Sequence, residues 1–327
     1  MGGHCRRDLW HGPEVHGGSR DRATRSRAPQ PIPYQGSKRR LAPIVLGYLP
    51  PHVDTLWEPF VGSGAVTIAA AMAERADRFV VGDSLAPLVA IWRAILGGGE
   101  ALCDAYEALW EAQRDDPRAY FDRVRDRFNR ERGAAELLYL VARCVKNAVR
   151  FNREGAFNQS PDNRRLGMKP ATLRRRVDAA HRLLAGRARA VCGDYAESLR
   201  AASPGDVVYM DPPYLGVSGG RDPRYHQGLD YRRFVAELES ANRRGLSYLV
   251  SFDGRSGAKT FGPGLPAGLA LHRVEIHAGR SSQATLSGRD DETVESLYVS
   301  PALVTRLREA GVPLRQREDV PRPETGE

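Results

Sequence analysis

Short, almost wholly apolar runs recur along this chain, and the first of them is followed by a glycine loop and an Ala-rich stretch typical of a helix. These runs predict strands at residues 54–60, 79–83, 188–192, 206–210 and 247–251. A strand that is apolar on both of its faces needs helices packed on both sides of its sheet. The first strand–loop–helix–strand unit, residues 54–83, implies a right-handed crossover between parallel strands. The sequence therefore predicts an α/β fold on a parallel sheet.

Helical periodicity replaces the strand pattern in the middle of the chain, where residues 101–150 are rich in Arg, Glu and Leu. Residues 152–170 are polar and contain glycine, which predicts a loop or hairpin, and a helix follows at 172–184. We therefore expect a sheet domain that a helical insert interrupts. The predicted divisions are a disordered basic arm at 1–30, the first part of the sheet domain at 31–105, the insert at 106–187, its second part at 188–310 and a flexible tail at 311–327.

Positive charge is concentrated in one segment of the chain. Between Arg143 and Arg189 there are 13 Lys and Arg residues and three acidic residues, a local balance of +10 in a chain whose net charge is +9. Such a segment suits a nucleic-acid backbone, although a solvated helical face would also be basic. The four cysteines stand apart in sequence, which argues against a zinc site and against a disulfide framework. No apolar run approaches the ~20 residues that cross a bilayer.

A glycine-containing loop, Glu58 to Gly64, follows the first predicted strand and opens into a helix. Glycine lets the backbone approach a ligand closely, but the loop lacks both the third glycine of a dinucleotide site and the lysine of a phosphate loop. Asp83, 25 residues after Glu58, ends the next predicted strand, where a carboxylate can accept both hydroxyls of a ribose. The alternative is a glycine turn that only packs a helix, with Asp83 as a cap.

The strand predicted at 206–210 ends abruptly in Asp211-Pro212-Pro213-Tyr214. Two consecutive prolines cannot donate hydrogen bonds to a neighbouring strand, so they stop the strand and stiffen the backbone. An acid, a fixed carbonyl and an aromatic ring are then presented at the carboxyl end of a strand, where ligand sites of α/β folds lie. The Asp211 carboxylate and the Pro212 carbonyl could accept the two hydrogens of an exocyclic amine, with Tyr214 stacked on the base. A simple turn is the alternative.

These motifs, in this order, resemble those of the Dam-type DNA adenine methylases, the alpha-order amino-methyltransferases. The resemblance covers residues 32–303 and implies a Rossmann-like methyltransferase sheet with an inserted helical domain that recognises the DNA target. It implies S-adenosylmethionine as the cofactor and Asp211, Pro212, Pro213 and Tyr214 as the catalytic motif. The cofactor-binding residues that it predicts, with an aspartate for the cofactor adenine at Asp194, are Tyr34, Lys38, Glu58, Pro59, Phe60, Gly62, Ser63, Gly64, Asp83, Ser84, Asp194 and Tyr195.

A further stretch, Arg150 to Asn158, is similar to the start of the DNA-reading hairpin of that family. Asparagine can pair with adenine and arginine with guanine in the major groove, while other cations meet phosphates. The residues predicted to bind DNA are Arg150, Asn152, Arg153, Asn158, Arg164, Arg165 and Lys169. Read without the family, Asn158 would be an ordinary turn former.

The chain departs from the family pattern at three places. Ser84 stands where the Dam group has an acid, and residues 160–170 replace the Pro-Phe-Gly that closes the hairpin in close relatives, so GATC specificity cannot be carried over. Residues 279–289, followed by Glu295-Ser-Leu-Tyr-Val, look closer to methylases that accompany restriction enzymes. We interpret 279–289 as a polar loop near the site, in contact with DNA, or as a surface hairpin.

The resemblance implies transfer of a methyl group from S-adenosylmethionine to N6 of a flipped adenine in double-stranded DNA. It also implies a cytoplasmic, nucleoid-associated enzyme with no metal and no membrane, and it leaves open whether a cognate restriction endonuclease is a partner. DNA cytosine-N4 methylation is the nearest alternative, and Asp rather than Ser at position 211 favours adenine. More distant alternatives are methylation of RNA adenine, methylation of protein glutamine, for which Asn is expected at 211, and a catalytically silent DNA-binding regulator.

Overall fold

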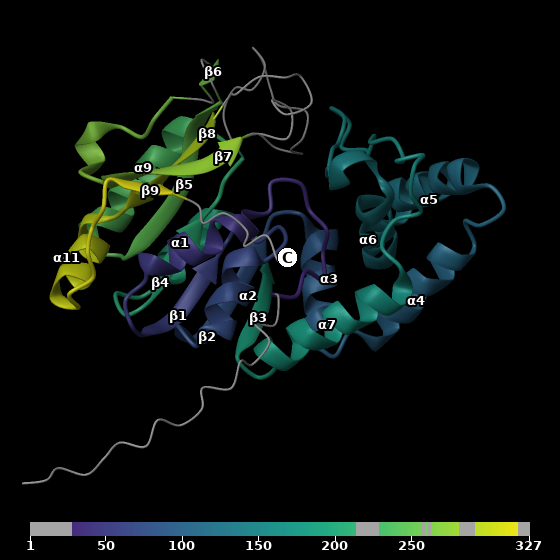
Figure 1. Cartoon of the computed structure of the whole chain (residues 1–327), viewed down its shortest axis with the longest axis horizontal. Coiled ribbons are helices and arrows are strands. Elements are labelled where there is room, and N and C mark those ends of the chain that lie inside the picture. Colours follow the sequence, from purple (N-terminus) through teal and green to yellow (C-terminus); the bar gives the residue numbers. More distant parts are fainter. Residues whose placement is uncertain (1–27, 214–228, 257–258, 261–262, 281–291, 320–327) are drawn as a thin grey trace, which may run out of the picture.

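The computed structural model describes residues 28–213, 229–256, 259–260, 263–280 and 292–319 (Figure 1). Its centre is a nine-stranded sheet with the order β3-β2-β1-β4-β5-β8-β7-β9, and β6 pairs with β5 off this path. Strands β3, β2, β1, β4 and β5 are parallel, whereas β8 is antiparallel to both β5 and β7. The strands are β1 (Val53–Glu58), β2 (Ala76–Asp83), β3 (Ala188–Cys192), β4 (Val207–Met210), β5 (Tyr248–Ser256), β6 (Lys259–Thr260), β7 (His272–Arg280), β8 (Glu292–Val299) and β9 (Arg317–Asp319).

Helices cover both faces of the parallel half, which explains why its strands are apolar throughout. Leu56 and Tyr209 belong to the core cluster on the face of α1, α2 and α3, and Trp57 and Met210 belong to the cluster on the face of α8 and α9. The α/β fold expected from the sequence is confirmed. The helices are α1 (Ala42–Gly47), α2 (Ala65–Met72), α3 (Ala86–Leu96), α4 (Glu100–Glu111), α5 (Pro117–Glu131), α6 (Ala134–Arg143), α7 (Pro170–Leu184), α8 (Tyr195–Ala201), α9 (Tyr231–Arg243) and α11 (Pro301–Glu309).

The predicted insert, residues 106–187, falls mainly on helices α4 to α7, which lie together at one side of the sheet (Figure 1). It is not separated from the sheet by a gap in the core, because one cluster of buried residues runs from Leu56 in β1 through Ile91 in α3 to Tyr139 in α6. The boundaries at residues 105/106 and 187/188 therefore stay a prediction. The expected basic arm lies outside the described residues up to residue 27, and Ala28 and Gln30 contact the side chain of Arg39.

The antiparallel edge of the sheet was not foreseen from the sequence. Strands β7, β8 and β9 extend the parallel half, and β9 pairs in parallel with β7 through Glu275 and Arg317. Residues 317–319 of the expected flexible tail thus belong to the sheet, and the division of the chain at residue 311 stays a prediction. No single helix of the described residues is long and apolar enough to cross a membrane, and α3 and α4 pass such a test only as a pair bent by 119°.

Gly64 sets the angle at which the glycine loop enters α2. It has φ +62°, and a Cβ built on it would lie 2.4 Å from the buried Trp92 ring. We predict that Gly64→Ala lowers the free energy of unfolding by about 2–4 kcal/mol, because left-handed backbone and overpacking both act against a side chain. Urea unfolding would measure this loss. Gly47→Ala is the matched control, since Gly47 ends α1 and a Cβ added there would meet nothing within 4 Å; equal effects in both variants would contradict the prediction.

Candidate active site

A cavity of about 460 Å³ opens at the carboxyl ends of β1, β2, β3 and β4. Strand β1 pairs with β2 on one side and with β4 on the other. The strand order along the sheet therefore changes direction at β1, and the cavity lies at this point. Open α/β sheets bind their ligands at this switch point. The segments that line the cavity are 34–38, 58–63, 83–85, 193–195, 211–213 and 229–230, together with Ala65, Val149, Phe151 and Arg233.

The loop after β1 forms one wall of the cavity and is fixed by its own hydrogen bonds. The carboxylate of Glu58, which is buried, accepts hydrogen bonds from the backbone N–H and the hydroxyl of Thr67 in α2. Burial raises the pKa of Glu58 to about 7 in spite of these bonds. Gly62 has φ +44°, and the ring of Tyr34 would lie 3.4 Å from a Cβ at that position. Ser63 and Ser37 share a hydrogen bond of 2.8 Å, which ties residues 34–38 to the loop.

Asp83 ends β2 and lies beside this loop in the cavity wall. Its Oδ1 accepts a hydrogen bond of 2.9 Å from the backbone N–H of Leu85, the residue that precedes α3. Desolvation raises the pKa of Asp83 to about 6, and backbone hydrogen bonds from Leu85, Gly62 and Ser84 oppose that rise. The carboxylate thus has acceptor capacity left for a polar ligand.

Asp211 follows β4 directly and shares one cation with a second carboxylate. The Nζ of Lys38 lies 3.0 Å from Oδ1 of Asp211 and 3.3 Å from Oε2 of Glu295 in β8. The ammonium group is almost fully buried, whereas the Asp211 side chain is 21% exposed to the cavity. Desolvation raises the pKa of Asp211 to about 6, the Lys38 charge lowers it, and the Glu295 charge raises it again. Asp211 is therefore an ionisable acceptor that faces the cavity and titrates just below neutrality.

Aromatic rings and an ion pair form the wall beyond β3. The rings of Phe60 and Tyr195 are stacked with their centroids 5.4 Å apart. Arg233 of α9 contacts both oxygens of Asp194 at 3.0 and 2.8 Å, and its guanidinium carbon lies 5.5 Å from the Tyr195 ring centroid. Asp194 also caps α8 by accepting from the N–H of Ala196. Most of its acceptor capacity is therefore used within the protein.

The segment predicted to read DNA forms a short hairpin whose strands meet in a bridge between Phe151 and Phe157. The side-chain oxygen of Asn152 is used within the turn, because Oδ1 accepts a hydrogen bond of 2.8 Å from the N–H of Ala156. The hairpin rests on α5, where Asn129 exchanges hydrogen bonds with the backbone of Phe157, and Arg132, directly after α5, donates to the carbonyl of Gly155. Its other end reaches the cavity through Phe151.

The predicted site residues largely come together. All the residues expected to contact the cofactor line the cavity except Gly64, whose left-handed backbone packs against Trp92 instead. Asp211, Pro212 and Pro213 line it too, whereas Tyr214 lies outside the described residues, as do residues 281–289 of the expected polar loop. The residues expected to bind DNA lie in the hairpin and in the loop after it. Their side chains are exposed, except that of Arg150, which is half-buried with no hydrogen-bond partner for its Nε among the described residues.

Sequence reasoning did not identify Arg233, Asp230 or Glu295 as parts of the site. Asp230 does carry a local signal, since it caps α9 by accepting from the N–H of Arg233. Potential metal ligands lie elsewhere: in the described part of the chain the one close group is His52, Asp54 and Asp77, which are exposed at the amino ends of β1 and β2.

The charge of the cavity limits the kind of ligand it can take. Carboxylates outnumber cations in its lining, with Glu58, Asp83, Asp194, Asp211 and Asp230 against Lys38 and Arg233. Such a lining disfavours the phosphates of a dinucleotide or of ATP, which need cations or free N–H groups. It suits a ligand with hydroxyl donors and positive charge. Together with the fold, this pocket and the Asp-Pro-Pro segment after β4 define a Rossmann-like methyltransferase.

Comparison with known proteins identifies the family within this class. Residues 34–243 match the model of the D12 class N6 adenine-specific DNA methyltransferases. This match covers more than half of the chain, so the chain belongs to that family, and the expectation from the sequence is confirmed.

Three relatives illustrate the similarity. A DNA N-6-adenine-methyltransferase of Escherichia phage P1 is 28% identical over 68% of this chain, but the match covers only 29% of that protein. The type II methyltransferase M1.LlaDCHI of Lactococcus lactis subsp. cremoris is 22% identical over 81% of this chain and 94% of its own length. The retron Ec67 DNA adenine methylase of Escherichia coli is 29% identical over 62% of this chain and 72% of its own length.

Proposed function

We propose that this protein transfers a methyl group from S-adenosylmethionine to N6 of an adenine that is flipped out of double-stranded DNA. The observation that carries the proposal is the position of Asp211. It faces the cavity at the carboxyl end of β4, beside the glycine loop and against the buried Lys38. A carboxylate so placed can engage an exocyclic amine inside the pocket that would hold the methyl donor.

The residues of the cavity fit S-adenosylmethionine. Its volume of about 460 Å³ lies within the range of small-molecule sites. Asp83 offers carboxylate oxygens for the two ribose hydroxyls, and Phe60 and Tyr195 offer aromatic surface for the adenine. The excess of carboxylates suits a sulfonium, which carries positive charge. When bound, the cofactor would supply an electrophilic methyl group that the sulfonium already activates.

The protein's own part in the reaction is to position and activate the amine. The lone pair of an aromatic amine is delocalised into the ring, so the amine is a weak nucleophile. By accepting hydrogen bonds from the two amine hydrogens, Asp211 and the carbonyl of Pro212 favour a tetrahedral nitrogen with a localised lone pair. The Asp211 carboxylate also stabilises the positive charge that develops on this nitrogen. Stacking of Tyr214 on the flipped base stays a prediction from the sequence.

The basic segment between Arg143 and Arg189 supports DNA as the substrate. Its hairpin, residues 150–158, joins the cavity at Phe151, so a base held in the cavity and a duplex held on the hairpin can belong to one DNA molecule. We propose a cytoplasmic, nucleoid-associated enzyme on the same grounds. The likeness to a protein named as a type II methyltransferase supports a cognate restriction endonuclease as a partner.

The direct test is to incubate the purified protein with labelled S-adenosylmethionine and mixed-sequence duplex DNA, digest the DNA to nucleosides and identify the labelled one. N6-methyladenine is the expected product, and sequencing the modified strand would supply the recognition site. N4-methylcytosine would overturn the base assignment and keep the pocket and the chemistry. Label that appears only when RNA replaces DNA, or in neither, would overturn the proposal.

The rate should depend on pH through Asp211. Only the ionised carboxylate can both accept a hydrogen bond from the amine and stabilise the positive charge that develops on it. Protonation removes this ionised form as the pH falls through the pKa of about 6. We expect kcat/KM for DNA, measured at saturating cofactor, to fall about tenfold per pH unit well below that value. Glu295→Gln removes a negative neighbour, lowers the pKa of Asp211 and moves this acid limb to lower pH. An acid limb that stays in place in Glu295→Gln would contradict this coupling.

A further inference from the structure

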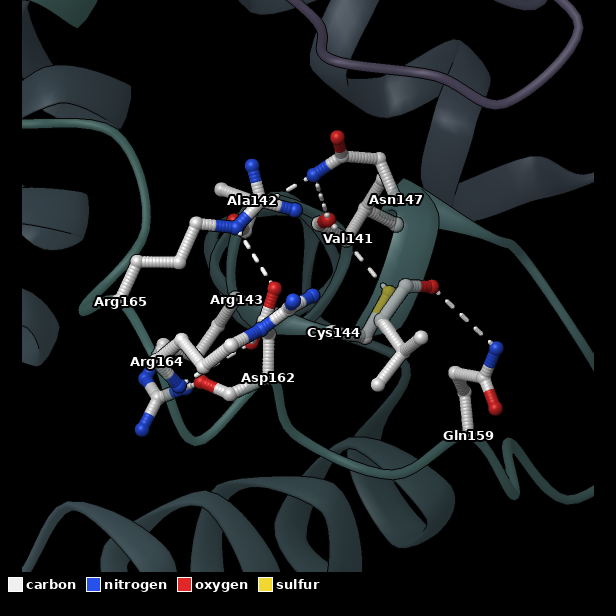
Figure 2. Close-up of polar contacts among 10 residues, drawn as sticks. Val141, Ala142, Arg143, Cys144, Asn147, Gln159, Asp162, Arg164 and Arg165 are labelled. Carbon is white, nitrogen blue, oxygen red and sulfur yellow. Dashed lines mark hydrogen bonds and ion pairs between the residues drawn. The ribbon is translucent and has the colours of Figure 1, made fainter. Parts of the chain in front are cut away.

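One acidic residue lies buried within the basic surface of the recognition segment. The side chain of Asp162 is 5% exposed, and its two oxygens pair with two arginines: Oδ1 lies 3.3 Å from Nε of Arg164 and Oδ2 lies 2.8 Å from Nε of Arg165 (Figure 2). Oδ1 also accepts from the backbone N–H of Arg164 at 3.1 Å. These bonds hold the pKa of Asp162 at about 2, well below the ordinary range, so the carboxylate is ionised at neutral pH.

The two arginines keep their guanidinium groups in solvent while Asp162 holds them. The Arg164 and Arg165 side chains are 87% and 54% exposed. In both, the ion pair with Asp162 is made by Nε, the nitrogen nearest the chain. The two terminal NH₂ groups stay able to form an end-on bidentate contact with guanine or phosphate. An ion pair through Nε therefore orients the side chain without occupying its recognition end.

Asp162 is itself fixed to the helices of the insert. Its N–H donates to the carbonyl of Arg143 at 2.9 Å, and its carbonyl accepts from the guanidinium of the same arginine (Figure 2). Arg143 is buried at the end of α6, and its Nε donates to Oε1 of the buried Gln113 at 2.8 Å. Gln113 in turn donates to the carbonyl of Leu166, and Tyr106 donates to that of Met168. The loop thus has a rigid base beneath its exposed arginines.

We propose that Asp162 is a positioning residue for base recognition: its buried carboxylate holds Arg164 and Arg165 in the conformations that read the DNA target. This rests on the proposed function as a DNA methyltransferase. An arginine side chain loses rotamer freedom when it is immobilised, and Asp162 has restricted both arginines before DNA arrives. Recognition by preordered arginines favours one base over another, whereas mobile arginines can bind any phosphate.

The effect of Asp162→Asn on base discrimination distinguishes a positioning role from a purely electrostatic one. An acid beside DNA repels phosphates, so its neutralisation alone would tighten binding to every sequence. If Asp162 positions the arginines, Asp162→Asn tightens or keeps the nonspecific binding and yet weakens discrimination between bases. Asparagine keeps the oxygen that caps the N–H of Arg164, so the turn itself should survive.

The test compares Asp162→Asn with Glu154→Gln in the full-length protein. Glu154 is an exposed acid of the hairpin that precedes Asp162, with no ion pair in the part of the chain that the structure describes. Both variants therefore remove the same negative charge. Mixed-sequence duplex DNA is methylated to a low extent with S-adenosylmethionine and sequenced for methylated bases. We expect Asp162→Asn to lower the preference at one or two positions of the target about tenfold. Glu154→Gln should leave it within twofold and keep the melting temperature of the wild type, whereas Asp162→Asn, which loses the stabilising ion pairs, should melt somewhat lower and still be folded at the assay temperature.

Removing both arginines provides a second measurement that a merely structural role would not reproduce. If Asp162 acts through Arg164 and Arg165, the double variant Arg164→Ala/Arg165→Ala relaxes the same target positions, and adding Asp162→Asn to it causes no further loss. Wild-type discrimination in Asp162→Asn, or a further loss in the triple variant, would overturn the positioning role while wild-type methylation of DNA remained. The proposed function would fail separately, through a wild-type protein that methylates no DNA.

Discussion

Asp211→Asn will lower the rate of DNA methylation by about a thousandfold, while the affinity for S-adenosylmethionine stays within a few-fold of the wild type. Removing one preorganised group that stabilises charge in the transition state, such as a hydrogen-bond donor of an oxyanion hole, costs about 10²–10³-fold in rate, and a carboxylate that faces a developing charge should count for at least as much. Asparagine has nearly the shape of aspartate, but it has one oxygen acceptor and no charge to offer to the amine. The cofactor should still bind, because Asp83, Phe60 and Tyr195 lie in other parts of the cavity wall.

Single-turnover methylation of DNA and calorimetric titration with the cofactor measure the two quantities independently. Asp77→Asn is the control, since Asp77 is 65% exposed at the start of β2, the opposite end of that strand from the cavity. Folding offers a further check. The pKa of Asp211 is raised to about 6 from its ordinary 3.8. Its ionisation therefore destabilises the folded protein as pH rises from about 4 to about 6. At pH 7 the variant should not unfold more easily, and a rate close to wild type would contradict the assignment of Asp211.

The parts of the site that the sequence could predict lie at the ends of the parallel strands. Glu58, Asp83 and Asp211 each follow an apolar run, and in a parallel sheet the carboxyl ends of all such runs meet at one edge. Local pattern therefore suffices to bring them together, without any knowledge of how the strands are ordered. The proline pair after Asp211 adds a stop signal that no other strand of this chain carries at that point.

Long-range pairing decides the parts that could not be predicted. Glu295 reaches Lys38 only because β8 lies beside β5, with Glu295 opposite Gly254. Nothing within a few residues of Glu295 encodes that register, and the same holds for β9, three residues that pair at the far edge of the sheet. Arg233 is similar, because its contact with Asp194 spans 39 residues and depends on where α9 packs.

Composition alone also gave an incomplete account of the recognition segment. Its arginines and asparagines were foreseen as a group, but local geometry assigns them different tasks: Asn152 closes a turn, whereas Arg164 and Arg165 are held at the surface. Asp162 counted only as one acid against many bases in the sequence. Its burial and its two ion pairs, which only the structure reveals, indicate that this acidic residue orients the two arginines beside it.

Asp83→Ala should weaken the binding of S-adenosylmethionine about a hundredfold and leave kcat at saturating cofactor nearly unchanged. A hydrogen bond to a charged acceptor contributes about 1.5–3 kcal/mol, and Asp83 is proposed to accept two from the ribose. We therefore expect a loss of roughly 3 kcal/mol in the free energy of cofactor binding. Because the ribose is distant from the reacting methyl, its hydrogen bonds to Asp83 stabilise the ground state and the transition state equally. Their loss raises KM for the cofactor and leaves kcat unchanged.

Asp83→Asn separates this role from the alternative in which Asp83 only caps the start of α3. Asparagine can still accept from the N–H of Leu85, so a capping role would leave both cofactor binding and stability close to wild type. A ribose-binding role instead predicts that Asp83→Asn keeps the melting temperature and loses about tenfold in affinity, between the wild type and Asp83→Ala. Calorimetric titration of the three proteins with cofactor decides between the two roles. Unchanged affinity in both variants would show that the acid at the end of β2 serves the fold and that the ribose is held by other groups of the cavity.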